Sequence, residues 1–314
     1  MNAWRRASCN SARRGSPVTG NWIDRPEGGA PFALRLLCSF ALAFGRGPAR
    51  AVLHPVALYF MMRRGPERRA SRSFLSRVLG RPATVGDVYR HILCFSRVTL
   101  DRLFLLQEGT RRFEIECSGL EEVERLLEMR RGILLLGAHF GSYEATRVLG
   151  INQPHIRFRT VIDIDQNPAM SRLLNSLNPQ LAATVINSRD AGPGVALAIR
   201  DALGEGAIVA LLADRLRPGG KSSDTPFLGG IAQFPMAPWE IAAALGVPVV
   251  ACFGVYRGRN RYDLQFETLA EQVVRERDGG RPLADWIRVF ADRLERQVRG
   301  APLNWFNFYD FWPG

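Results

Sequence analysis

The chain has 314 residues, of which 46% are hydrophobic and 23% charged. This composition is typical of a folded globular protein and excludes an intrinsically disordered chain. The length suffices for one large α/β domain with extra elements, or for two small domains. The net charge of +12 is unevenly placed: the first 100 residues hold 17 arginines and four acidic residues, and the remainder is close to neutral.

This basic end lies next to apolar segments, a combination that favours an anionic membrane surface as partner. Nucleic acid is the alternative partner of a basic protein. The arginines here flank long apolar stretches, whereas a nucleic-acid face more often mixes basic residues with Lys, Ser and exposed aromatic residues. We therefore expect anionic membrane lipids as partners, and no nucleic acid.

The five cysteines are scattered and form no C-x-x-C pair, so they indicate neither a disulfide framework nor a zinc site. Three of them, Cys38, Cys94 and Cys252, lie in apolar contexts and are expected in the core. This usage fits a reducing compartment.

The N-terminal part divides into a leader and two apolar segments. Residues 1–30 are a basic leader that we expect to be disordered. The segment Phe32–Phe44 contains Arg35 and is shorter than the roughly 20 residues needed to span a bilayer. The second segment is Ala49–Arg64. We interpret the two as an uncleaved helix pair lying at a membrane interface. A signal peptide, with Ala41–Ala43 as a cleavage site, and a plain pair of core helices are the alternatives.

Residues 71–107 continue as helix, because apolar residues recur at three- and four-residue spacing. The segment 80–88 breaks this helix, and Thr84 or Asp87 is a candidate cap for the next one. We thus expect membrane-associating helices over 31–110 and an α/β domain over 111–314.

The α/β domain is predicted from apolar runs that alternate with helical stretches. Such alternation implies a mostly parallel sheet covered by helices on both faces. The expected strands are Phe113–Cys117, Gly132–His139, Phe158–Ile162, Ala183–Ile186, Ile208–Ala213, Val247–Val255 and Tyr262–Phe266. The expected helices are Leu120–Met129, Ser142–Leu149, Pro168–Leu177, Gly192–Leu203, Ala237–Leu245 and Pro282–Arg299.

The stretch "GILLLGAHFGSYE" carries the candidate catalytic residues. His139 follows a buried strand, at the edge where open α/β sheets bind their ligands. Ser142 is a candidate N-cap, and Glu144 falls in the first helical turn, where the helix dipole favours an acid. Because His139 precedes the helix, the two side chains can converge, and Glu144 can fix the tautomer of the imidazole. The free nitrogen could then deprotonate an alcohol. An ordinary surface histidine is the alternative.

Several segments resemble the bacterial lipid A late acyltransferases, the lauroyl/myristoyl branch of the lysophospholipid acyltransferase superfamily. The segment "LLLGAHFGSYE" matches that family's strand, histidine, four residues and acid. Further blocks are "RTVIDIDQNPAM" with Asn167, "IRDALGEGAIVALLADR" ending in Asp214-Arg215, and "TPFLGG" with Phe227 and Gly229. The resemblance extends from about Phe32 to the end of the sequence.

The chain also departs from that family's pattern. Arg215 stands where the family usually has Gln, and the C-terminal "LNWFNFYDFW" is more similar to a sub-branch found beside aryl-polyene or fatty-acid clusters. The acceptor is therefore open between lipid A and an aryl-polyene or other lipid. The aromatic residues of this stretch are interpreted either as a tail docked on the core or as an apolar wall near an acyl channel.

The resemblance implies transfer of a fatty acyl chain from acyl carrier protein, or coenzyme A, to a lipid hydroxyl. His139 would deprotonate the hydroxyl and Glu144 would orient His139. Arg159 and Arg215 are candidate oxyanion donors or phosphate clamps, and Asp214 would hold one of these arginines. Asn167, Phe227 and Gly229 would contribute to substrate binding, although Gly229 could serve only to permit a turn.

The resemblance implies no metal or redox cofactor, and acyl carrier protein and a lipid acceptor as partners. We expect the protein on the cytoplasmic face of the inner membrane. An adaptor that keeps the fold without catalysis is the alternative from another class. An α/β hydrolase is disfavoured because no G-x-S-x-G motif is present.

Overall fold

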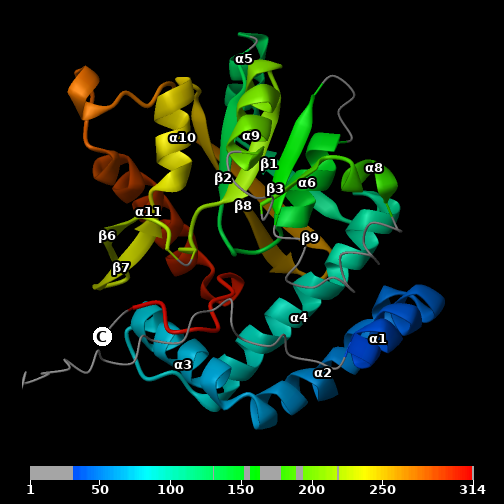
Figure 1. Cartoon of the computed structure of the whole chain (residues 1–314). Coiled ribbons are helices and arrows are strands. Elements are labelled where there is room, and N and C mark those ends of the chain that lie inside the picture. Colours follow the sequence, from blue (N-terminus) through cyan, green and yellow to red (C-terminus); the bar gives the residue numbers. More distant parts are fainter. Residues whose placement is uncertain are drawn as a thin grey trace, which may run out of the picture.

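The computed structural model describes residues 31–129, 131–151, 156–162, 178–188, 194–217 and 219–312 (Figure 1). The expected disordered leader and the expected helix at Pro168–Leu177 lie outside these residues. The described chain is a mixed α/β structure whose mostly parallel sheet is flanked by helices, as the sequence predicted.

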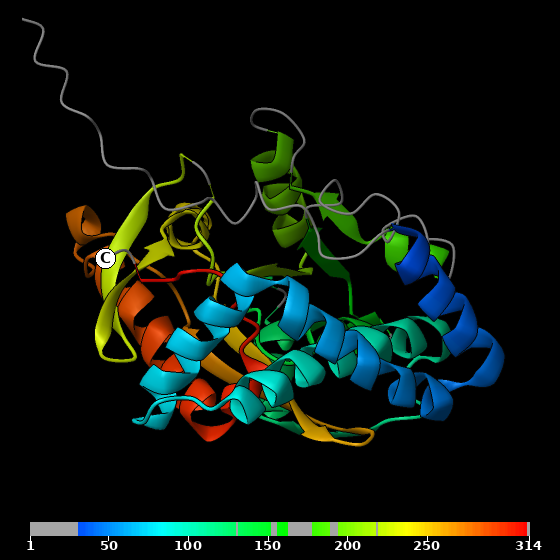
Figure 2. The same cartoon turned by 90° about the horizontal axis from the view of Figure 1, so that it is seen from below.

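Four helices precede the sheet: α1 (Pro31–Phe44), α2 (Arg46–Arg63), α3 (Gly65–Leu79) and α4 (Val85–Glu108). The break between α3 and α4 falls where the sequence placed it. Thr84 caps α4 through a capping box, in which its hydroxyl accepts from the Asp87 N–H and the Asp87 carboxylate accepts from the Thr84 N–H. Figures 1 and 2 show the four helices along one side of the sheet domain.

Seven strands form the main sheet, in the order β1-β9-β8-β2-β5-β3-β4. All neighbouring pairs are parallel except β8 and β9, which form an antiparallel hairpin. The strands are β1 (Glu114–Ser118), β2 (Ile133–Gly137), β3 (Phe158–Ile162), β4 (Val185–Asn187), β5 (Ile208–Leu212), β8 (Val249–Gly258) and β9 (Arg261–Ala270). The helices between and after them are α5 (Leu120–Glu128), α6 (Tyr143–Ile151), α8 (Pro179–Ala182), α9 (Gly194–Gly204), α10 (Ala237–Leu245) and α11 (Leu283–Gly300). Two short 3-10 helices, η2 (Glu276–Asp278) and η3 (Pro302–Asn304), flank α11.

A two-stranded hairpin, β6 (Ser222–Phe227) and β7 (Gly230–Pro235), was not predicted from the sequence. Its two-residue turn consists of Leu228 and Gly229, with φ of 49° and 75°. Positive φ at both turn residues matches the right-handed twist of a hairpin. Gly229 therefore permits the turn, which is one of the two roles predicted for it from the sequence.

The hydrophobic core lies on both faces of the sheet. Every residue of β2 is buried, as expected for a strand covered on both sides. Leu134 and Leu136 belong to a large cluster that extends from Cys38 in α1 to Trp312. Ile133 and Leu135 face a smaller cluster that includes Val123 of α5. The division into helices before residue 110 and a separate domain after it stays a prediction.

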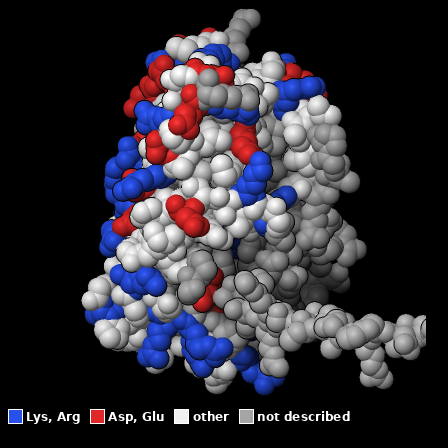
Figure 3. All heavy atoms as spheres, turned by 60° about the vertical axis from the view of Figure 1, so that its left-hand side comes forward, with Lys and Arg blue, Asp and Glu red and all other residues white. Residues whose placement is uncertain are grey.

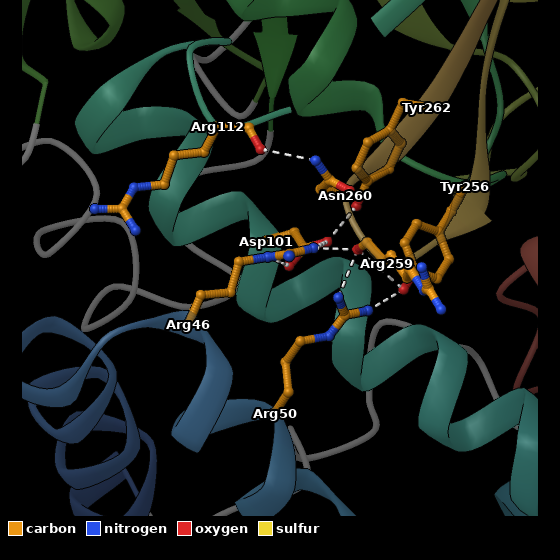
Figure 4. A network of polar contacts seen from close by, with 8 residues as sticks. All are labelled: Arg46, Arg50, Asp101, Arg112, Tyr256, Arg259, Asn260 and Tyr262. Atoms are coloured by element: carbon orange, nitrogen blue, oxygen red, sulfur yellow. Dashed lines mark hydrogen bonds and ion pairs between the residues drawn. The ribbon is translucent and has the colours of Figure 1, made fainter. Parts of the chain in front are cut away.

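A buried ion pair ties the N-terminal helices to the sheet (Figure 4). The Arg46 guanidinium on α2 donates twice to the Asp101 carboxylate on α4, at 2.6 and 2.7 Å. The Tyr262 hydroxyl on β9 donates to the same carboxylate at 2.9 Å. Arg50 contacts the Tyr256 hydroxyl and the carbonyl of Arg259 in the β8–β9 turn. These contacts fix α2 on the domain.

No helix within the described ranges is both long and apolar enough to cross a bilayer.

Candidate active site

The loop that follows β2 places His139 beside a tightly packed turn. Gly141 has φ of +58°, and a Cβ there would lie 1.8 Å from the Gly254 carbonyl oxygen. Only glycine fits this position. The Ser142 N–H donates to that same carbonyl at 2.7 Å. The Ser142 hydroxyl accepts from the Ala145 N–H at 3.2 Å, so it caps α6 as predicted. Together these contacts hold the backbone that follows His139.

Asp214 lies beside His139 because of the register of the sheet. Strands β2 and β5 are parallel neighbours, with Gly137 opposite Leu212. His139 and Asp214 each follow their strand end by two residues, so both are carried to the same edge of the sheet. The Asp214 side chain is only 1% exposed, and that of His139 is 29% exposed.

The Asp214 carboxylate accepts three hydrogen bonds. His139 Nδ1 lies 2.8 Å from Oδ1, and the His139 backbone N–H donates to Oδ2 at 3.0 Å. The indole N–H of Trp305 also donates to Oδ2, at 3.2 Å. Since the carboxylate accepts, Nδ1 carries the imidazole proton and Nε2 is free of one. Within the described part of the chain, Nε2 has no hydrogen-bond partner.

The charges around the pair favour a neutral imidazole and an ionised carboxylate. Burial and the nearby Arg215 lower the pKa of His139, and Asp214 opposes them. Burial acts to raise the pKa of Asp214, but His139 and Arg215 outweigh it and hold this pKa at about 2. The geometry is that of a general base: an imidazole with one nitrogen held by an acid and the other available for a proton.

Glu144 is not the carboxylate that contacts His139. It is 5% exposed in the first turn of α6, and both of its oxygens face arginines. Arg147 Nη1 lies 2.8 Å from Oε1, and Arg102 Nε, from α4, lies 2.8 Å from Oε2. Burial opposes its ionisation, but the two guanidinium groups lower the pKa of Glu144. Two cations attract this carboxylate more strongly than a neutral imidazole does, so the expectation that Glu144 orients His139 is corrected: Asp214 has that place.

Arg215 is the only one of the two predicted arginines that lies near His139. Its Nη2 donates to the Phe306 carbonyl at 2.9 Å, and its guanidinium lies over the Tyr309 ring. Arg159 on β3, in contrast, lies opposite Val209 of β5. Val209 also lies opposite Leu134 of β2, on the other side of β5, so Arg159 is level with Leu134. It therefore lies about five residues, or roughly 16 Å along the strands, before His139. Its guanidinium donates to the Ala183 carbonyl at 3.2 Å. The expectation that Asp214 holds an arginine gives way to its contacts with His139 and Trp305.

The remaining predicted residues divide into two groups. Asn167 lies outside the described residues. Phe227 is 1% exposed, and its ring packs edge-on against Trp305 at 5.2 Å between centroids. It is therefore part of the aromatic core beneath the site.

Trp305 also contacts the His139–Asp214 pair, and this contact was not predicted from the sequence. The available signal was the dense aromatic stretch at 305–312, which was interpreted as a docked tail or an apolar wall. The interpretation as a docked tail fits most of that stretch, because Trp305, Phe306, Phe311 and Trp312 are buried. The contact of one indole N–H with Asp214 is a long-range pairing that no local pattern reveals.

One comparison with known protein families matches most of the chain. A family model described as bacterial lipid A biosynthesis acyltransferase matches residues 100–313, about two thirds of the chain. The matched range includes His139, Asp214 and Trp305. No curated protein matches the chain.

Proposed function

Because the chain belongs to the bacterial lipid A biosynthesis acyltransferase family, we propose that it moves a fatty acyl chain from a thioester donor to a hydroxyl of a lipid A-type acceptor, with His139 as general base. The observation that carries this proposal is the buried Asp214 carboxylate on Nδ1 of His139, which leaves Nε2 to take the hydroxyl proton. The intact pair is also the reason to prefer an enzyme over a non-catalytic adaptor.

In the proposed reaction, His139 Nε2 removes the proton of the acceptor hydroxyl as its oxygen attacks the thioester carbonyl. The Asp214 carboxylate stabilises the imidazolium that forms. The tetrahedral intermediate collapses as the carbon–sulfur bond breaks, and the imidazolium returns the proton to the thiolate. Arg215 is the candidate group for the developing oxyanion or for an acceptor phosphate, because its guanidinium lies close enough to influence His139.

The test is acyl transfer by the purified full-length chain in detergent micelles, with radiolabelled acyl-acyl carrier protein or acyl-coenzyme A as donor. Separate reactions receive a lipid A precursor and a total lipid extract as acceptor. Wild type should form a labelled lipid, and His139→Ala should form none. His54→Ala is the matched control, because the His54 ring contacts Tyr89 on the N-terminal helices. Equal product from wild type and His139→Ala would refute the base assignment.

We further propose that α1 and α2 lie on an anionic membrane. Helix α2 buries Ala49, Leu53, Ala57 and Met61 against the domain, a stripe at four-residue spacing. Outside that stripe, large apolar side chains of both helices are exposed: Leu36, Leu42, Phe44, Leu58, Tyr59 and Met62. An exposed apolar patch on a basic helical segment suits a lipid surface. Flotation with phosphatidylglycerol vesicles should recover the wild-type chain, and Leu58→Ser/Met62→Ser should remain at the bottom of the gradient.

We assign the basic face of α3 to acyl carrier protein, an acidic donor. Figure 3 shows Lys and Arg gathered at the lower end of the molecule, where α3 lies in Figure 1, with acidic residues mixed in higher up. Arg68, Arg69 and Arg72 of α3 are exposed. Charge complementarity of this kind mainly speeds association. Arg69→Glu should raise KM for the acyl carrier protein donor and leave KM for acyl-coenzyme A unchanged. An equal rise for both donors would contradict this assignment.

A further inference from the structure

We propose that Trp305 is a positioning residue of the active site, whose indole N–H holds the Asp214 carboxylate in the orientation that keeps its other oxygen on His139. The inference rests on the proposed role of His139 as the base. It separates Trp305 from the remainder of the aromatic C-terminal stretch, which packs as core.

The backbone around Trp305 is bonded directly to the His139 loop. The Gly141 N–H donates to the Asn304 carbonyl at 2.7 Å, and the Phe306 N–H donates to the His139 carbonyl at 2.8 Å. These two bonds flank Trp305 in one segment and Phe140, the neighbour of His139, in the other. Any displacement of the segment 304–306 therefore moves the loop that carries the base.

The segment is also fixed from its opposite side. The Asn304 side chain accepts from the Tyr256 N–H at 2.8 Å and donates to the Tyr256 carbonyl at 3.2 Å. His91 on α4 contacts the Trp305 carbonyl through Nε2 at 2.9 Å. Trp305 itself is 1% exposed. The sheet and α4 thus hold its backbone, and its ring packs against Phe74, Phe227 and Phe311, which gives the indole N–H a fixed direction.

The carboxylate requires such a donor. Asp214 Oδ1 faces His139 Nδ1, and Oδ2 takes the His139 backbone N–H and the Trp305 indole N–H. A buried charged acceptor gains more from each donor than an exposed one does. Without the indole, Oδ2 keeps a single donor, and the carboxylate can rotate away from the imidazole. The loss would be felt as a poorly oriented base.

Trp312 supplies a matched control. It is also a buried tryptophan of the same stretch, 6% exposed, and its indole N–H also donates a hydrogen bond. Its acceptor, however, is the Phe227 carbonyl at 3.0 Å, and not the site carboxylate. Replacement of either tryptophan by Phe removes one indole N–H and a similar volume of core.

The experiment compares wild type, Trp305→Phe and Trp312→Phe in the full-length chain. We expect Trp305→Phe to lower kcat by roughly 10- to 100-fold, the loss typical of a donor to a buried charge, with little change in KM. Without the indole N–H, more negative charge stays on the Asp214 carboxylate and favours a protonated imidazole. The pKa of His139 therefore rises, and the acid limb of the kcat/KM profile moves to higher pH. Trp312→Phe should lower thermal stability about as much as Trp305→Phe does, without moving the acid limb.

The outcome that overturns the proposal is equal behaviour of the two variants in kcat and in pH profile. If Trp305→Phe does not fold, benzothienylalanine at position 305 keeps the shape of the side chain and replaces the N–H with sulfur. Nitrogen-15 NMR of the His139 ring provides a readout that needs no substrate. An altered tautomer or pKa only when the indole N–H at 305 is lost would support the proposal, even if wild type failed to transfer acyl groups.

Discussion

At the residue scale, the basicity of His139 is set by groups of opposite sign. Burial and Arg215 lower its pKa, and the Asp214 carboxylate raises it. Asp214 is bonded to Nδ1, and the proton is taken at Nε2. The site thereby keeps the imidazole neutral and correctly oriented at the same time.

Replacement of Asp214 by Asn should lower kcat by roughly 10²- to 10⁴-fold, because the amide can favour the wrong tautomer and cannot stabilise an imidazolium. Since Asp214 raises the pKa of His139, its loss should lower that pKa. The acid limb of kcat/KM would then move to lower pH, opposite to the direction expected for Trp305→Phe. Rate measurements across the acid limb check this, and a shift to higher pH would contradict the assignment.

Replacement of Glu144 by Gln tests the other carboxylate. Glu144 neutralises the buried Arg147 as well as the partly exposed Arg102. Its loss leaves the Arg147 charge buried, which costs on the order of 3–5 kcal/mol of stability. Any residual activity should keep the wild-type acid limb, since Glu144 does not contact the imidazole. Chemical denaturation and the pH profile measure the two effects separately. A moved limb with unchanged stability would restore Glu144 as the partner of His139.

At the element scale, one histidine joins α3, α4 and the C-terminal segment. His91 is fully buried on α4, with Nδ1 2.8 Å from the Ser71 hydroxyl on α3 and Nε2 2.9 Å from the Trp305 carbonyl. Burial lowers its pKa to about 4. The ring is therefore a neutral connector between elements, and a proton on it would leave a buried charge.

This connector predicts a pH dependence of stability. The unfolded chain binds a proton to His91 near its ordinary pKa of about 6.5, whereas the folded chain binds it only near pH 4. Stability is thus fully present above about pH 6.5 and is lost as pH falls toward 4, by about 3 kcal/mol in total. His91→Gln should be less stable at pH 8 but should show a flatter decline between these values. Urea denaturation at several pH values measures the difference, and a decline as steep as that of wild type would contradict the assignment to His91.

The sequence predicted the elements better than the contacts between them. The four N-terminal helices and the seven strands of the main sheet follow from hydrophobic periodicity, and the Thr84 cap follows from local chemistry. The β6–β7 hairpin was missed because its strands carry little apolar alternation and its turn begins with Leu228, an uncommon residue at positive φ. His139 was found through its place after a buried strand. Asp214 and Trp305 were not linked to it, since their pairing depends on sheet register and on a segment that is 166 residues further along the chain in the case of Trp305.

At the scale of the whole molecule, helices α1 and α2 and the loop that carries His139 pack on one hydrophobic cluster. Asp101 on α4 is completely buried and holds Arg46 of α2 and Tyr262 of β9. The exposed apolar side chains of α1 and α2 are thereby held at a fixed position relative to the sheet. A chain docked through these helices would present its site to the lipid in one orientation.

Replacement of Asp101 by Asn should loosen this attachment, because it removes the anion that neutralises Arg46. If membrane docking positions the site, the ratio of activity on vesicles to activity on detergent micelles should fall by roughly tenfold, while the micelle activity of the folded fraction is largely kept. Tyr262→Phe is the control, since it removes only one hydrogen bond from the same carboxylate. Equal losses in vesicles and micelles would show that the ion pair serves stability alone.

The register that brings His139 beside Asp214 also restricts how this protein can change in evolution. Each residue follows its strand end by two positions, and Gly137 lies opposite Leu212. A single-residue insertion or deletion in either short connection would carry one partner past the other, whereas length changes in the β6–β7 turn would leave the pair untouched. The acid that contacts the histidine is therefore found by counting from the ends of two neighbouring strands, and not by its distance from the histidine along the sequence.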